Sequence, residues 1–110
     1  MEINKETENQ IKELQVLEQN LQSVMMQKQT FQLELSEIDN ASLELSKVSD
    51  DVYKIAGNIM VKSSKESLLK DLKQKKELIS LRLKSLDSQE EKLAETTEEI
   101  RKKVLSTIKK

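Results

Sequence analysis

The side chains that could do chemistry in this chain are almost all carboxylates and amines. Its 110 residues include 20 Asp and Glu and 19 Lys and Arg, but no His and no Cys. Without His, the chain lacks the commonest general base and zinc ligand. Without Cys, it lacks thiolate nucleophiles, disulfides and thiolate metal sites. Carboxylates can pair for acid/base catalysis or hold Mg²⁺, but on polar helix faces they are far more often solvated charges.

The glycine content excludes a further class of site. A Walker loop or a dinucleotide fingerprint needs at least two glycines, and this chain has one, Gly57. We therefore expect no enzymatic activity, no catalytic residues, no cofactor and no metal site. The chain contains no run of about 18 apolar residues, so no membrane span is predicted. The N-terminal MEINKETENQ lacks the apolar region of a secretory signal. A soluble cytoplasmic protein without membrane partners is the resulting expectation.

Both halves of the chain carry the heptad pattern of a coiled coil, in which seam positions follow one another at alternating spacings of three and four. The first series is Ile3, Thr7, Gln10, Leu14, Leu17, Leu21, Val24, Lys28, Phe31, Leu35, Ile38, Ser42 and Leu45. The second is Leu69, Leu72, Lys76, Ile79, Leu83, Leu86, Glu90, Leu93, Thr97, Ile100 and Val104. The polar members of these series are expected to fix register and partner at some cost in stability.

The charges of the two arms favour pairing within one chain over pairing of each arm with another chain. Residues 1–50 carry 4 basic and 10 acidic side chains, whereas residues 63–110 carry 13 basic and 9 acidic ones. Opposite net charges favour arm-to-arm contact. Because the arms are of nearly equal length, both termini should then lie together at one end, which we call the tip.

The segment VYKIAGNIMVK, Val52 to Lys62, interrupts the helical pattern near the middle of the chain. It is rich in β-branched and apolar residues, and Gly57-Asn58 suits a tight two-residue turn. We predict a β-hairpin of roughly 51–56 and 59–62. A second helix is expected from Ser63, because Ser63 and Glu66 have the spacing of a capping box.

An isolated hairpin is marginally stable and leaves both edges open. Joining hairpins from several chains into a shared sheet or barrel removes those edges. An ordinary loop between two helices is the alternative. The residues expected to mediate oligomerisation are Val52, Tyr53, Ile55, Gly57, Ile59, Met60 and Val61.

The predicted fold is therefore mainly α: a long antiparallel two-helix coiled coil with one central β-hairpin that joins an oligomeric β-barrel platform. It forms a single domain over 1–110, with a first arm at 1–49, the hairpin at 51–62 and a second arm at 63–110.

Several segments resemble the β-type subunit of prefoldin, a co-chaperone of archaea and eukaryotes. They are Val52-Tyr53-Lys54, Gly57, Ile59 to Lys62, QKQ at 27–29 and LRLKSLDSQEEKL at 81–93. Ala56 is smaller than the aliphatic residue common in the family. Ser63-Ser64 replace a more strand-like continuation, which puts the last rung of the second strand in doubt. One hairpin, where α-type subunits carry two, indicates the β-type.

The resemblance implies a hexamer of two α-type and four β-type subunits, whose hairpins form a double β-barrel platform. It also implies an ATP-independent holdase that binds non-native proteins at the arm tips and passes them to a group II chaperonin.

Independently of the resemblance, apolar residues near the tip favour client binding. Burial of apolar surface stabilises a complex without requiring a particular client sequence. Ile11, Leu105 and Ile108 lie off the seam, so packing of the arms does not readily explain them. The alternative is that the tip residues only close the last heptads. The candidate client-binding residues are Ile3, Ile11, Leu14, Leu17, Ile100, Val104, Leu105 and Ile108.

Two other functions compete with the holdase. One is a coiled-coil scaffold or spacer that oligomerises through its hairpin and binds a dedicated folded partner. The other is nucleic-acid binding, which draws only on the basic run at 101–103 and the two terminal lysines. A net charge of −1 and 2% aromatic residues argue against nucleic acid.

Overall fold

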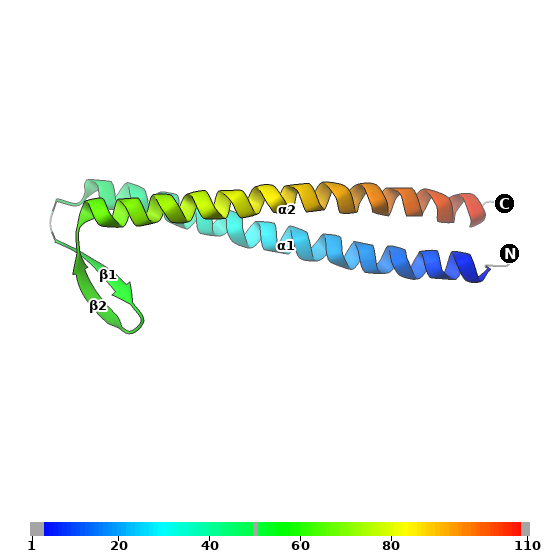
Figure 1. Cartoon of the computed structure of the whole chain (residues 1–110), viewed down its shortest axis with the longest axis horizontal. Coiled ribbons are helices and arrows are strands. Elements are labelled where there is room, and N and C mark those ends of the chain that lie inside the picture. Colours follow the sequence, from blue (N-terminus) through cyan, green and yellow to red (C-terminus); the bar gives the residue numbers. More distant parts are fainter. Residues whose placement is uncertain (1–3, 50, 109–110) are drawn as a thin grey trace. The chain divides into compact units, whose positions relative to one another are not determined.

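A computed structural model describes residues 4–49 and 51–108. In chain order, one long helix precedes and another follows a two-stranded antiparallel sheet (Figure 1). The elements are α1 (Lys5–Lys47), β1 (Val52–Ala56), β2 (Ile59–Ser63) and α2 (Lys65–Ile108). This confirms the predicted arrangement of helix, central hairpin and helix, which arises because Gly57 is the chain's only glycine and no proline breaks either arm.

Side-chain caps mark where both helices begin. Asn4 Oδ1 accepts a hydrogen bond from the N–H of Thr7 at 2.7 Å, so Asn4 caps α1. At α2 the Oγ of Ser64 accepts from the N–H of Ser67 at 3.1 Å. The prediction that Ser63 caps this helix is wrong by one residue. Ser63 pairs with Val52 as the last rung of the sheet instead.

The described chain forms two compact units. The terminal unit contains the described residues up to Gln29 together with those from Lys84 onward, and the central unit spans Thr30–Leu83. Within each unit a segment of α1 lies beside a segment of α2, and the two run in opposite directions (Figure 1). The first turns of α1 and the last turns of α2 therefore belong to the same unit, as the sequence predicts.

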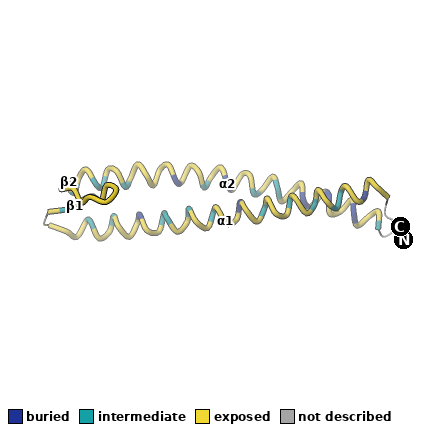
Figure 2. The backbone as a smooth tube through the Cα atoms, turned by 90° about the horizontal axis from the view of Figure 1, so that it is seen from below, coloured by how far each residue is buried: buried dark blue, intermediate teal, exposed yellow. Residues whose placement is uncertain are grey.

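Burial follows the heptad series on both helices (Figure 2). On α1, every described seam position is buried or half-buried, and only two positions off the seam, Ile11 and Glu34, share that property. On α2 the exception is Lys76, which is exposed and forms an ion pair with Asp39 at 2.7 Å. The buried apolar side chains are Val24, Ile38, Ile79, Leu86, Ile100 and Val104.

Candidate functional site

The hairpin is the first candidate site, and its register determines which side chains share a face. Tyr53 pairs with Lys62 and Ile55 with Met60, whereas Lys54 pairs with Val61 and Ala56 with Ile59. Because side chains alternate along a strand, these two sets of pairs lie on opposite faces. Gly57 forms the turn with φ of +63°, a conformation that other residues adopt at a cost.

Most of the hairpin's large apolar side chains lie exposed. Ile55 is 72% exposed and its partner Met60 66%, while Ile59 on the opposite face is 67% exposed. Tyr53 and Val61 are about half exposed, and only Val52 among the predicted oligomerisation residues is half-buried. Contiguous apolar surface of this kind usually marks an interaction site. Beyond the half-buried rung of Val52 and Ser63, the side chains on both faces of the hairpin lie exposed.

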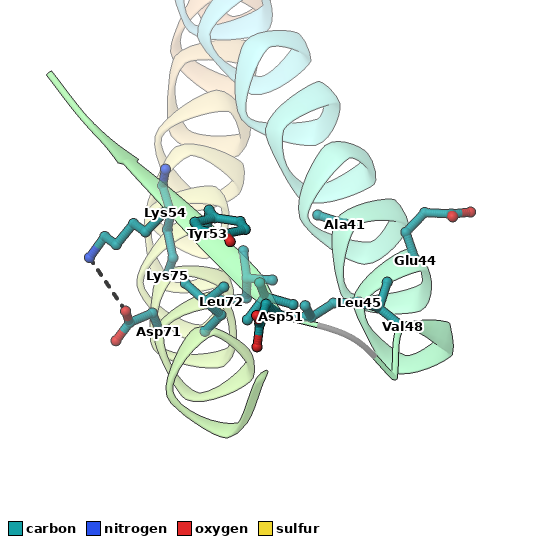
Figure 3. A pocket seen from close by; sticks show the side chains of 12 residues that line it. Ala41, Glu44, Leu45, Val48, Asp51, Tyr53, Lys54, Asp71, Leu72 and Lys75 are labelled. Carbon is teal, nitrogen blue, oxygen red and sulfur yellow. Dashed lines mark ion pairs between the residues drawn. The ribbon is translucent and has the colours of Figure 1, made fainter. Parts of the chain in front are cut away.

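A groove of about 780 Å³ lies between the hairpin and the adjoining ends of the two helices (Figure 3). Lys54 forms an ion pair with Asp71 of α2 at 3.5 Å, which ties β1 to that helix. The apolar and aromatic lining residues are Ala41, Leu45, Val48, Val52, Tyr53, Leu68 and Leu72. The groove continues the uncovered apolar surface of the hairpin down to the helices.

Lys65 fastens the end of α1 to the start of α2. Its Nζ donates to the carbonyl oxygens of Ser46 at 2.9 Å and Val48 at 3.1 Å. The last carbonyls of a helix have no partner within the helix, and a cation there also interacts favourably with the helix dipole. Since no glycine follows α1 to form the usual C-cap, a lysine from the next helix fills that role. Sequence analysis did not identify this contact, because the spacing of Lys65 from Ser46 gives no local signal.

The tip is the second candidate site, and the structure separates its predicted residues by burial. Ile100 and Val104 are buried within the seam, at 8% and 6% exposure. Leu105 is 47% exposed. The remaining described candidates are half-buried: Ile11, Leu14, Leu17 and Ile108. All seven belong to the terminal unit, and Ile3 lies outside the described residues.

Two ion-pair clusters join the arms within the terminal unit. Lys28 Nζ lies 2.6 Å from Asp87 and 3.1 Å from Glu90, and these carboxylates, Asp87 first, raise the pKa of Lys28 above its ordinary value. Lys28 and Glu90 are both polar seam positions, which were predicted to fix the register of the two arms. In the structure they form an ion pair with each other. Nearer the tip, Arg101 contacts Glu18 at 3.1 Å and Glu98 at 2.9 Å.

Arg101 was predicted only as part of a basic run. Its hydrogen bond to Glu18 is the main cause of a raised pKa for its guanidinium. The signal for this pair is that Glu18 and Arg101 each flank the seam, one residue C-terminal to Leu17 and to Ile100. That signal becomes readable only once the pairing register of the two arms is known.

Within residues 4–49 and 51–108, no group of three or more Asp and Glu side chains is placed to hold a metal ion. Neither described helix has the combination of length and apolar content that crossing a membrane requires.

A family model described as Prefoldin subunit matches residues 8–110. The prefoldin subunit beta of Archaeoglobus fulgidus is 41% identical over 105 residues, which cover 94% of this chain and 90% of that protein. The same subunit of Pyrococcus furiosus is 37% identical over 99 residues, covering 88% and 85% respectively.

A solved structure agrees with these sequence relatives. The crystal structure of the prefoldin beta subunit from Thermococcus strain KS-1 superimposes with a TM-score of 0.89 at 34% identity, covering 96% of this chain and 95% of that one. Family model, relatives and fold match over nearly the whole chain, and the resemblance stated from the sequence is confirmed. The chain belongs to the prefoldin subunit family, whose members are chaperones that assemble with one another.

Proposed function

We propose that this chain is a β-type subunit of a cytoplasmic prefoldin hexamer that holds non-native proteins at its tips and delivers them to a group II chaperonin. It acts by binding alone, without nucleotide, cofactor or catalysis. Membership of the prefoldin family supports the co-chaperone role. The further steps rest on the surfaces that the chain leaves uncovered.

The hairpin is the proposed assembly surface. Ile55 and Met60 on one face, and Ile59 on the other, are each about two-thirds exposed or more. Pairing with hairpins of an α-type subunit and of further copies of this chain would bury both faces and close both edges. We propose two α-type and four β-type subunits. Within each β-type chain, residues 1–49 and 63–110 act as arms and residues 51–62 as the assembly segment.

The main observation in support of client binding is that some apolar side chains at the tip are not buried in the seam between the two helices. Leu105 is 47% exposed, and Ile11 and Ile108 are half-buried off the seam. Burial of such surface contributes roughly 25 cal/mol per Å² without sequence readout. Weak binding at several tips in one assembly raises the overall affinity through effective concentration.

The buried tip residues take part differently. Ile100 and Val104 face the opposite arm, so a client reaches them only where the last turns of the helices separate. Leu14 and Leu17 are half-buried and partly accessible without such opening. Ile3 completes the proposed client-binding set.

Light scattering from an unfolded test protein, diluted into buffer without nucleotide, tests this function. The additive is the chain assembled with an α-type prefoldin subunit, either full-length or lacking residues 1–11 and 100–110. We expect the full-length assembly to suppress scattering and the truncated one, at unchanged native mass, to lose suppression. A correctly assembled full-length complex that suppresses nothing would contradict the holdase and favour the scaffold.

A further inference from the structure

Methionine supplies all of the sulfur in this chain, which has four Met and no Cys. Met1 lies outside the described residues, and the other three are exposed: Met25 at 48%, Met26 at 62% and Met60 at 66%. An exposed thioether is open to two-electron oxidants such as hydroperoxides, which convert it to the sulfoxide. The consequence of that reaction depends on where each side chain lies.

Met60 is the methionine of the hairpin. It pairs with Ile55 across the two strands, and the neighbouring pair on the same face is Tyr53 with Lys62. Ile55 is 72% exposed and Tyr53 is 53% exposed. Met60 therefore lies within an apolar face that the single chain leaves uncovered and that the proposed assembly would bury.

Met25 and Met26 lie away from that face. Both belong to α1 and to the terminal unit, whereas the hairpin belongs to the central unit. Their exposure is close to that of Met60, so an oxidant in solution should reach all three in the free chain. They therefore serve as an internal reference for oxidation outside the proposed assembly surface.

Oxidation turns Met60 from an apolar side chain into a polar one. The sulfoxide oxygen is a hydrogen-bond acceptor, and burial of an acceptor without a donor is costly. Ile55 offers no side-chain donor, and the ammonium of Lys62 already forms an ion pair with Asp51 at 3.7 Å. Tyr53 lines the groove between the hairpin and the helices. A hairpin that carries the sulfoxide therefore resists burial against another subunit.

We propose that Met60 is a redox-sensitive modification site whose oxidation in the free chain blocks assembly. The thioether sulfur attacks a hydroperoxide: the S–O bond forms, the O–O bond breaks, and the remaining oxygen leaves as water or an alcohol. Sulfur loses two electrons and the peroxide gains them. A methionine sulfoxide reductase reverses the step, with two thiols oxidised to a disulfide and the oxygen released as water.

This inference rests on the proposed assembly through the hairpin and adds a means of regulating it. In the assembly Met60 is covered by another subunit, so oxidation and assembly exclude each other. Oxidant therefore acts on newly made or dissociated chains and spares those already assembled.

Hydrogen peroxide tests the proposal on the free full-length chain, at a concentration where its native mass is that of a monomer, and on the complex with an α-type subunit. Peptide mass spectrometry measures the sulfoxide fraction at each methionine. In a second arm, the free chain is oxidised, separated from peroxide and then mixed with the α-type subunit, and native mass measures assembly. Met60→Leu removes the proposed site at nearly constant volume, and the double variant Met25→Leu with Met26→Leu is the matched control.

We expect Met60 to be oxidised at least fivefold more slowly in the complex than in the free chain, while the rates at Met25 and Met26 change less than twofold. Oxidation beforehand should weaken assembly of the unmodified chain and of the double variant at least tenfold. Treatment with methionine sulfoxide reductase should restore it, and Met60→Leu should assemble whether or not it has met peroxide.

Equal assembly of the oxidised and untreated chains, with Met60 fully converted to the sulfoxide, would overturn the proposal and leave the proposed assembly intact. Loss of assembly in peroxide-treated Met60→Leu would also overturn it, because the loss would then come from another residue. Equal oxidation rates at Met60 in the free chain and the complex would contradict the shielding. Failure of the untreated chain to assemble with an α-type subunit would instead overturn the proposed assembly itself.

Discussion

Replacement of Ile55 by aspartate should dissociate the assembly while leaving the helices intact. Ile55 is 72% exposed in the single chain and pairs with Met60, which is 66% exposed. Full burial of an isoleucine side chain is worth about 1.5–3 kcal/mol, so roughly 1–2 kcal/mol of that is gained only when another subunit covers the residue. A carboxylate buried there without a partner costs several kcal/mol more.

Together these contributions amount to about 5 kcal/mol or more at each covered hairpin, which corresponds to over a thousandfold in an association constant. Val61→Asp changes the opposite face. It should weaken assembly less, because Lys54 lies directly across the strand pair and can form an ion pair with the new carboxylate.

Native mass, from size-exclusion chromatography with light scattering, reads out assembly, and far-UV circular dichroism reads out helicity. The matched control is Leu81→Asp, because Leu81 is 66% exposed but lies on α2. We expect this control to keep the native mass of the unmodified assembly. An Ile55→Asp variant of unchanged native mass, or a Leu81→Asp variant that dissociates equally, would refute the argument.

The seam, the ion pairs and the turn give three further predictions. Ile79→Ala should lower the free energy of unfolding by roughly 2–5 kcal/mol, since Ile79 is 4% exposed. In the same urea titration, Leu78→Ala should cost under about 0.5 kcal/mol because Leu78 is 55% exposed, and similar values for the two would contradict the seam assignment. Lys28 has a raised pKa when folded, so its contribution is fully present below its unfolded pKa of about 10.4 and is lost as pH rises through the folded value. The stability difference between the unmodified chain and Lys28→Met should therefore stay constant up to about pH 10 and shift against the unmodified chain as the pH rises above about 10.4, and a constant difference through that range would contradict the pairing. Gly57→Ala should destabilise the hairpin by roughly 1–2 kcal/mol, because φ is +63° at this position. Faster hydrogen exchange of the hairpin amides would reveal this loss, and unchanged exchange would count against the turn geometry.

The seam was predictable because burial in a two-helix coil depends on a local repeat. Spacings of three and four identify which side of each helix is covered, and a few turns of either arm contain this information. Lys76 shows the limit of the pattern. Its seam position predicts burial, but its long side chain reaches Asp39 and keeps the ammonium in water. The hairpin was predictable for a similar reason, because its signal is also local: β-branched residues lie on both sides of Gly57, which suits a tight turn.

Contacts between distant residues were not predictable, because they depend on how the two arms align. The partnership of Lys28 with Asp87 and Glu90, and of Arg101 with Glu18, follows from a register that neither arm encodes alone. The prediction of the N-cap of α2 was wrong for a different reason. The local signal favours Ser63, because Glu66 follows it at capping-box spacing, but Ser63 pairs with Val52 across the sheet and Ser64 caps the helix instead.

Site-specific photocrosslinking tests the central claim, that clients are held at the tip, most directly. A benzophenone side chain would replace Leu105 in one assembly and Leu33, which is 62% exposed in the central unit, in another. Each is irradiated with an unfolded test protein without nucleotide. The account predicts crosslinks from position 105 and few from position 33. Equal labelling from both positions, or labelling from position 33 alone, would contradict it.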